Sequence, residues 1–402
     1  MAGDAILIAA QSGRALAEAA RRAGLRPYVA DLFGDADTLA LAEAHRPLRG
    51  RFGATRLGAE DVLAQLDALA QNAGGRPLGV VLGSGFEGAP DLMARIGARH
   101  RLLGAAPEAV ARLKDPFGLA RLCARLAIPH PAVTSEAVAD PGLHLLKRAG
   151  GSGGSHVRAA TPGRAPPGHY FQARVPGAAF ALNLLADGRD IAVLALTEQW
   201  SAPSRLRPFR YAGAIAPGRG AAPALPPALV AAIVAAVARL AAETGLRGLA
   251  SADLLSDGTR WWLTEVNPRP GATLDVLDRR ETSLLAAHVA ASAGRLVPTG
   301  PPPVDAAGAE ICYGARDYRP MPRLAWPDHA RDRPRAGTRV ARDAPLCTLL
   351  ATGADAGAVR RNLRERAAQL QALLAQEDTD EHDREVSQRQ RADGAPGGAP
   401  GG

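Results

Sequence analysis

Short apolar runs alternate with amphipathic stretches over the first hundred residues. Residues 5–10 form a continuous apolar run of strand length, and residues 13–23 then place apolar side chains at helical spacing. Two further apolar runs, at 27–33 and 78–82, are also of strand length. A strand, a helix and a second strand in this order favour a parallel sheet. We therefore predict an α/β domain over residues 1–107.

The middle of the chain has a different pattern, in which short strands follow one another through tight turns. A helix is predicted at 115–127 and a strongly apolar helix at 229–244. The remaining segments alternate as strands do and predict hairpins; they are residues 144–148, 156–160, 170–175, 179–185, 190–196, 248–255 and 260–266. We assign residues 108–297 to one α+β domain, followed by a proline-rich linker.

The last hundred residues predict a smaller unit. Residues 309–351 are rich in strand-forming residues and turn prolines, and residues 358–376 form an amphipathic helix. We therefore expect a small β-rich C-terminal segment with a terminal helix over 304–376. Residues 377–402 are polar and then rich in Gly, Pro and Ala, with nothing to bury, so a disordered tail is predicted.

The charge of the chain is compatible with several classes of partner. The net charge is +8 and the pI is about 10.1, values that can indicate nucleic-acid binding. However, the arginines are spread along the chain, and the few aromatic residues are not interleaved with basic clusters. We therefore expect small anionic molecules and phosphates as partners, and no nucleic acid.

The apolar segments and the cysteines indicate a cytoplasmic protein. The first apolar run is too short for a signal peptide, and we expect no membrane-spanning segment of 18 apolar residues. Three cysteines, Cys123, Cys312 and Cys347, are odd in number and far apart in sequence. They predict neither a disulfide framework nor a zinc site.

Lysine is almost absent from this arginine-rich chain. Of 48 lysines and arginines, only Lys114 and Lys147 are lysines. Guanidinium is a broad planar fork, whereas the lysine ammonium is compact and can sit among phosphate oxygens. The two lysines therefore indicate positions where arginine does not fit, although chance survival of two surface lysines is the alternative.

A glycine-rich stretch follows the second lysine. Residues 147–155 read Lys-Arg-Ala-Gly-Gly-Ser-Gly-Gly-Ser, and the four glycines free backbone N–H groups to converge on phosphate oxygens; they are Gly150, Gly151, Gly153 and Gly154. A flexible linker would have a similar composition. Because this stretch joins two strands of one predicted hairpin, a phosphate-binding loop is favoured.

Two carboxylates and an amide form the strongest local pattern. Glu265 and Asn267 are two residues apart on a predicted strand, so their side chains leave the same face. The predicted hairpin brings Asp253 near them on the neighbouring strand. Such hard oxygen ligands suit Mg²⁺ that also takes phosphate oxygens. Surface ion pairs with arginines are the alternative for the two acids. Arg269, just beyond, could hold an anion at the rim of the site.

Together these motifs resemble enzymes of the ATP-grasp superfamily of the carboxylate–amine ligase or carboligase type, and the resemblance implies a distant relationship of this chain to biotin carboxylase. The resemblance is specific from about residue 110 to 275. It implies an N-terminal α/β pre-ATP-grasp domain, a two-subdomain α+β nucleotide clamp and a small β-rich C-terminal segment. It further suggests a subgroup linked to one-carbon metabolism.

The resemblance also implies roles for individual residues. ATP phosphates would be bound by Lys114, Lys147 and the glycine loop, and adenine by the backbone around Gln172, Ala173 and Val175. Mg²⁺ or Mn²⁺ would be held by Asp253, Glu265 and Asn267. Catalysis would depend on Lys147 and on Arg269, which steadies an acyl phosphate. One departure is that Ala178–Ala181 lacks the glutamate with which many members bind ribose.

Three functions remain open from the sequence. The first is an ATP- and Mg²⁺-dependent ligase that activates a carboxylate as an acyl phosphate for attack by an amine or similar nucleophile. The second is an ATP-dependent carboxylase that phosphorylates bicarbonate, and the third is a non-catalytic nucleotide-binding module. Small-molecule substrates would contact the loops 11–14 and 83–88 and the rim 269–273, and a homodimer is also open.

Overall fold

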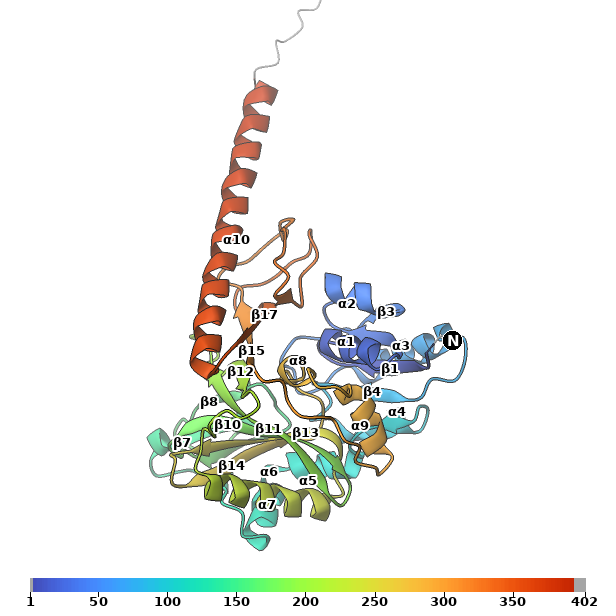
Figure 1. Cartoon of the computed structure of the whole chain (residues 1–402). Helices are drawn as coiled ribbons and strands as arrows, with labels where there is room; N and C mark the ends of the chain where they lie inside the picture. Colours follow the sequence, from blue (N-terminus) through green and yellow to red (C-terminus); the bar gives the residue numbers. More distant parts are fainter. Residues whose placement is uncertain (1–2, 394–402) are drawn as a thin grey trace, which may run out of the picture.

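The computed structural model describes the backbone of residues 3–393 and the side chains of residues 3–377. Three sheets build the molecule, with a long C-terminal helix that extends away from them (Figure 1). The sheets correspond to the N-terminal α/β unit, a small four-stranded unit and a large antiparallel sheet.

The N-terminal unit contains a five-stranded parallel sheet in the order β3-β2-β1-β4-β5. The central strand is apolar throughout because helices cover both of its faces. Leu7 packs in one core cluster with α3, whereas Ile6 and Ile8 pack in another with α1 and α9. The strands are β1 (Ala5–Ala9), β2 (Arg26–Asp31), β3 (Ala44–Pro47), β4 (Val80–Leu82) and β5 (Leu102–Leu103). The helices are α1 (Arg14–Arg22), α2 (Ala36–Leu41), α3 (Ala59–Asn72) and α4 (Pro90–Gly97), with α9 (Leu284–Ser292) added from later in the chain.

The four-stranded antiparallel sheet has the order β6-β9-β7-β8. It confirms the predicted hairpin around the glycine-rich stretch, since Lys147 on β7 is paired with Val157 on β8. The strands are β6 (Val133–Thr134), β7 (His144–Arg148), β8 (Val157–Ala159) and β9 (His169–Ala173). Helices α5 (Pro107–Lys114) and α6 (Pro116–Arg125) precede this sheet, and a short 3₁₀ turn, Pro141–Leu143, leads into β7.

The large sheet has eight strands in the order β14-β13-β10-β11-β12-β15-β17-β16. The strands are β10 (Ala178–Asp187), β11 (Ile191–Ser201), β12 (Tyr211–Ala216), β13 (Arg247–Ser256), β14 (Trp261–Asn267), β15 (Ala306–Tyr313), β16 (Ala330–Arg331) and β17 (Pro345–Gly353). The short helix α8 (Leu274–Leu277) follows β14.

The predicted C-terminal β-rich segment therefore does not form a sheet of its own. Residues of β12 pair with β15, for example Ile215 with Gly308. An uncovered edge strand presents unpaired backbone groups, and β15 satisfies those of β12. The division into units at residues 107, 297 and 304 stays a prediction.

Helix α7 (Pro227–Thr244) differs from the expectation that no segment of the chain is long and apolar enough to span a membrane. Among the described residues it is the one helix long and apolar enough to cross a membrane, whereas we expected no such segment. In the structure its buried face, which includes Ile233, Val237 and Leu240, joins the core cluster of the large sheet. Figure 1 shows α7 lying along that sheet.

Helix α10 (Ala356–Asp393) is longer than predicted. Its first part packs Val359, Leu363 and Leu370 against β15 and β17. The sequence predicts a disordered tail from residue 377, and the structure assigns helix as far as Asp393. No Gly or Pro interrupts this stretch before Gly394, and helix propensity therefore permits continuation. The rest of the predicted tail, 394–402, lies outside the described residues.

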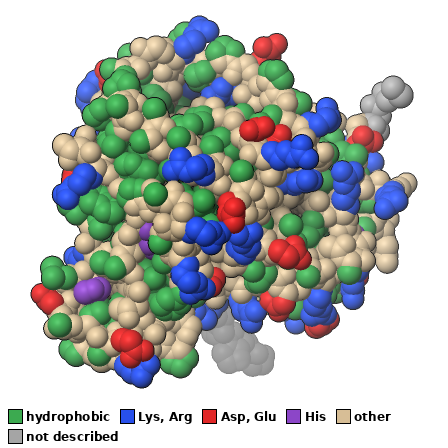
Figure 2. All heavy atoms as spheres, turned by 90° about the horizontal axis from the view of Figure 1, so that it is seen from below, with side chains coloured by type: hydrophobic (Ala, Val, Ile, Leu, Met, Phe, Trp, Pro, Cys, Tyr) green, Lys and Arg blue, Asp and Glu red, His purple; other side chains and the backbone are tan. Residues whose placement is uncertain are grey.

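The surface carries both signs of charge. On the face that Figure 2 shows, Lys and Arg side chains are interspersed with acidic and apolar ones. Many arginines are paired with carboxylates on neighbouring elements, as Arg99 is with Asp67 at 2.6 Å. Exposed pairs of this kind contribute about 0–1 kcal/mol each to stability.

A buried histidine links the N-terminal sheet to the large sheet and predicts acid sensitivity. His288 accepts a hydrogen bond from Leu249 N (2.8 Å) and lies 3.0 Å from Leu103 O, and burial lowers its pKa to about 4. Its ordinary value is 6.5, so the unfolded chain binds more protons between these values. Stability should be full above pH 6.5 and fall, by at most about 3 kcal/mol from this group, as the pH drops to 4.

Urea unfolding measured across this pH range checks that expectation. His288→Gln keeps a donor and an acceptor but does not titrate, and it should show a smaller dependence of the unfolding free energy on pH. An equal pH dependence in the variant would assign the acid sensitivity to other groups.

Candidate functional site

The predicted acid and amide side chains meet at one end of the β13–β14 hairpin. Asp253 is directly opposite Glu265, and Ser251 is opposite Asn267, so the two acids and the amide share one face of the sheet. A bulge next to Asp253 leaves Thr264 as the extra residue, and its hydroxyl donates to Asp253 O at 3.0 Å. The structure thus supplies the strand register that the sequence left open.

Lys114, at the C-terminal end of α5, contacts both Glu265 and Asn267. Its Nζ lies 2.5 Å from Glu265 Oε1 and 2.9 Å from Asn267 Oδ1. Asn267 Nδ2 donates to Asp253 Oδ2 at 2.8 Å, whereas Asp253 Oδ1 is buried without a hydrogen-bond partner. A buried carboxylate oxygen without a partner is costly, and it indicates a place for a cation or a donor.

The two carboxyl groups titrate differently. Burial, reinforced by Glu265, raises the pKa of Asp253 to about 6. Burial acts in the same direction on Glu265, but the combined effect of Lys114, His156 and Lys147 outweighs it and lowers the pKa of Glu265 to about 2. Glu265 is therefore already paired with the Lys114 ammonium, whereas Asp253 has no ion-pair partner of its own.

These donors fit a hard divalent cation. Two carboxylates and an amide oxygen suit Mg²⁺, which usually completes its coordination with water and phosphate oxygens. Among the residues described, no three His, Cys, Asp or Glu side chains gather in a set that could hold a metal by themselves. A metal here would therefore depend on oxygens brought by a ligand.

A small pocket opens beside this group, between the four-stranded sheet and β14. Its empty space is about 350 Å³, and its lining includes Lys114, Gly150, Gly151, His156, Gln172 and Glu265. Lys147 lies next to it, 6% exposed, and its Nζ donates to Gln172 Oε1 at 3.1 Å. Both lysines of the chain thus lie around one pocket.

Two predicted adenine-binding residues lie apart from the pocket lining. Ala173 ends β9, and its N–H donates to Ala132 O at 2.8 Å. Val175 lies in the connection between β9 and β10 and is half-buried. Gln172 does reach the pocket, but its side chain holds Lys147. The adenine-binding role of this segment stays a prediction.

Two glycines of the loop are packed tightly against other segments, which explains why these positions carry no side chain. A Cβ on Gly150 would lie 2.6 Å from Gly88 Cα, and one on Gly154 would lie 1.8 Å from Phe209 O. Both residues also have positive φ, 71° and 68°. Gly153 O accepts a hydrogen bond from Tyr211 N at 2.9 Å. The loop therefore bridges the N-terminal unit and β12.

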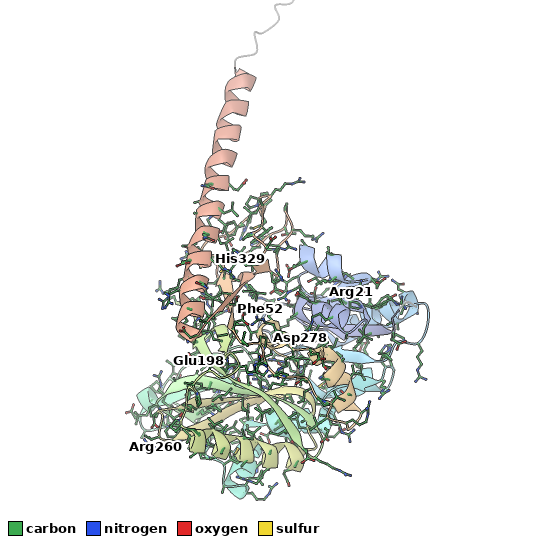
Figure 3. The ribbon with its side chains drawn as sticks, in the orientation of Figure 1. Arg21, Phe52, Glu198, Arg260, Asp278 and His329 are labelled. Atoms are coloured by element: carbon green, nitrogen blue, oxygen red, sulfur yellow. The ribbon has the colours of Figure 1, made fainter. Side chains whose placement is uncertain are left out.

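A larger pocket lies on the other side of the glycine loop, at the junction of the N-terminal unit and the large sheet. Its empty space, including the open mouth, is about 1070 Å³. All three predicted contact regions line it, with Gln11, Ser12, Arg14, Gly83, Ser84, Arg269, Pro270, Gly271 and Ala272. Phe52, labelled in Figure 3 near the centre of the molecule, contributes from the N-terminal unit.

Arg269 is held at the edge of this pocket by Glu87, a residue that sequence reasoning missed. Arg269 Nε donates to Glu87 Oε1 at 2.7 Å, and Glu87 Oε2 accepts from Gly85 N at 2.7 Å. Burial disfavours the charged form of Glu87, but Arg269, Lys114 and the hydrogen bonds that Glu87 accepts together outweigh it and lower the pKa. Glu87 lay within the loop 83–88 that we singled out, but only the tertiary structure shows its partner.

A second missed group lines the same pocket. Arg14 is 1% exposed and makes paired contacts with two carboxylates, Asp275 and Asp332, with Nη2–Oδ2 distances of 2.7 and 3.0 Å. Its partners come from α8 and from the segment after β16, 261 and 318 residues away. No local pattern in the sequence could have predicted this group.

Comparisons with known proteins agree with this fold. Residues 118–273 match the family model of the ATP-grasp domain, a range that contains every predicted site residue except Lys114. No curated protein sequence matches the chain.

Several solved structures have the same fold. The biotin carboxylase domain of 2-oxoglutarate carboxylase from Hydrogenobacter thermophilus has a TM-score of 0.66 and 13% identity, over 88% of this chain and 87% of that chain. Biotin carboxylase from Campylobacter jejuni has a TM-score of 0.64 and 14% identity, over 88% of each chain. Pyruvate carboxylase from Rhizobium etli has a TM-score of 0.67 and 18% identity, over 90% of this chain but 37% of that longer chain.

Residues 118–273 therefore match the ATP-grasp domain, in agreement with the resemblance found in the sequence. The chain as a whole has the fold of the biotin carboxylase domains. The predicted fold class is confirmed, including the terminal helix.

Proposed function

We propose that the protein is an ATP- and Mg²⁺-dependent ligase that activates a carboxylate as an acyl phosphate for attack by an amine or a similar nucleophile. The observation that carries this proposal is the position of the acid and amide group. Asp253, Glu265 and Asn267 lie beside a pocket bordered by lysines and a glycine loop, and Arg269 follows on the wall of a second, larger pocket. That arrangement suits transfer of a phosphoryl group from one pocket to a molecule in the other.

Each residue then has a specific task. Lys147 and the glycine loop would hold ATP phosphates, with Lys114 released from Glu265 toward them. Mg²⁺, held by Asp253, Glu265 and Asn267, would neutralise phosphate charge. Arg269, oriented by Glu87, would present its remaining N–H groups to the carboxylate. Positioning and charge neutralisation supply most of the catalysis in such reactions, and no covalent enzyme intermediate is needed.

A second candidate is an ATP-dependent carboxylase that phosphorylates bicarbonate. It is favoured by the fold of the biotin carboxylase domains, one of which was solved as a dimer with MgADP, ADP and bicarbonate. For this chain, small-molecule substrates and a homodimer are part of the proposal. The third function, a nucleotide-binding module without catalysis, is disfavoured by the complete acid and amide group.

The products that the protein forms from ATP distinguish these three functions. We expect ADP and inorganic phosphate in a screen of acid and amine pairs, with one carboxylate oxygen of an ¹⁸O-labelled acid recovered in phosphate, because the carboxylate itself attacks the terminal phosphorus. Hydroxylamine in place of the amine should trap the acyl group as a hydroxamate. Mass spectrometry of phosphate and of the hydroxamate makes both measurements.

Other product patterns would contradict the proposal. AMP and pyrophosphate would mean adenylation, and ADP without oxygen transfer would mean a kinase or phosphatase reaction. ADP formation that depends on bicarbonate alone would favour the carboxylase. Nucleotide binding without turnover for any acid would favour the non-catalytic module.

A further inference from the structure

Two cysteines that are far apart in sequence face each other across two neighbouring strands. Cys312 on β15 is directly opposite Cys347 on β17. Opposed residues of antiparallel strands have Cα atoms about 4.5–5.5 Å apart, within the range of about 4.4–6.8 Å that a disulfide spans. Both thiols are free, and the Cys347 thiol is hydrogen-bonded to that of Cys312. The sequence spacing had suggested no disulfide at all.

The pair lies at the neck of a protruding segment. The register shifts immediately after Cys312, and the two strands end one pair further on, at Tyr313 and Pro345. The chain between them, residues 314–344, carries Asp332, whose N–H donates to Asp37 of the N-terminal unit at 2.8 Å. A bond between the two sulfurs would therefore close the base of a segment that reaches across to another unit.

The two thiols differ in solvent exposure, and this difference determines which of them reacts first. Cys347 is 1% exposed within an apolar cluster, whereas Cys312 is half-buried at its border. The hydrogen bond to Cys312, together with burial, raises the pKa of Cys347. An oxidant therefore meets Cys312 first, with Cys347 waiting as the resolving thiol. The third cysteine, Cys123, is buried in α6, in a different core cluster.

We propose that Cys312 and Cys347 form a reversible cross-strand disulfide when the protein meets a peroxide. The Cys312 sulfur attacks the peroxide, the O–O bond breaks, and a sulfenic acid and one water form. The Cys347 sulfur then displaces the hydroxyl group as a second water, with the two thiol protons leaving in the waters. In total, two thiols are oxidised and one hydrogen peroxide is reduced to two waters, and a dithiol reductant reverses the change.

The experiment uses the folded full-length chain treated with hydrogen peroxide, then denatured and alkylated. We expect alkylatable thiols to fall from three to one and the intact mass, measured before alkylation, to fall by about 2 Da, with a peptide that links Cys312 to Cys347. Dithiothreitol should restore all three thiols. Cys123→Ser is the matched control and should still form the bond, whereas Cys312→Ser and Cys347→Ser should each abolish it.

The wild-type measurement alone can overturn the proposal, so it does not depend on how the variants fold. Three thiols that stay alkylatable, oxidation of Cys312 to sulfinic acid with Cys347 free, or disulfides only between chains would each refute it. None of these readouts involves ATP, and failure of the proposed ligase function would leave the result unaffected.

Discussion

Replacing Glu265 by Gln should lower Mg²⁺-dependent ATP turnover by about 100-fold or more, because even indirect partners of a metal ligand contribute about 10–100-fold. The amide keeps the shape and one oxygen toward Lys114 but removes the charge that pairs with this ammonium and would bind the metal. Binding of ATP measured by calorimetry should lose its dependence on Mg²⁺. The calorimetric measurement of ATP binding does not require the acid substrate.

Glu198→Gln is the matched control for this variant. Glu198 lies on β11 of the same sheet, toward α10 (Figure 3), and pairs with Arg360 at 3.0 Å, outside both pockets. It loses an ion pair of the same kind without touching the site, so nucleotide binding should be unchanged. If Glu265→Gln lowered the unfolding temperature but kept Mg²⁺-dependent binding per folded molecule, Glu265 would be structural.

Lys147→Arg should lose most turnover, about 10- to 100-fold, although the charge is conserved. Lys147 is 6% exposed and its ammonium contacts Gln172, so the larger guanidinium must displace its neighbours or enter the pocket. A planar fork also cannot reproduce the contacts of a compact ammonium among phosphate oxygens. ATP consumption and nucleotide affinity check this expectation.

Lys147→Met separates size from charge, since it has a similar length and no ammonium. We expect it to lose turnover as well, because the phosphates would lack a counter-charge. Arg95→Lys in α4, an exposed cation far from both pockets, should have no effect. Near-wild-type turnover in Lys147→Arg would mean that the scarcity of lysine says nothing about this site.

Much of the fold could be predicted because its signals are local. The buried strand β1 reads as an apolar run, and the β7–β8 and β13–β14 hairpins were placed from alternating residues and turns. The extension of α10 was missed because a polar composition indicated disorder, whereas the helix contains no residue that would end it before Gly394.

Part of the candidate site could also be predicted. Residues separated by two on one strand, such as Glu265 and Asn267, share a face whatever the rest of the fold does. Their alignment with Asp253 required the register, which a bulge at Thr264 sets. The contact of Lys114 with Glu265 joins α5 to β14 across 151 residues and could not be inferred from spacing.

Local patterns in the sequence were enough to predict the class of fold, the two hairpins, the glycine loop and the residue types that suit a nucleotide and a metal. These depend on periodicity and turn chemistry within a few residues. Four other features depend on the folded chain: β15 extends the large sheet, Glu87 holds Arg269, Arg14 lies between Asp275 and Asp332, and Cys312 faces Cys347. Each of these contacts joins side chains or strands distant in sequence, and the packing of whole sheets brings them together.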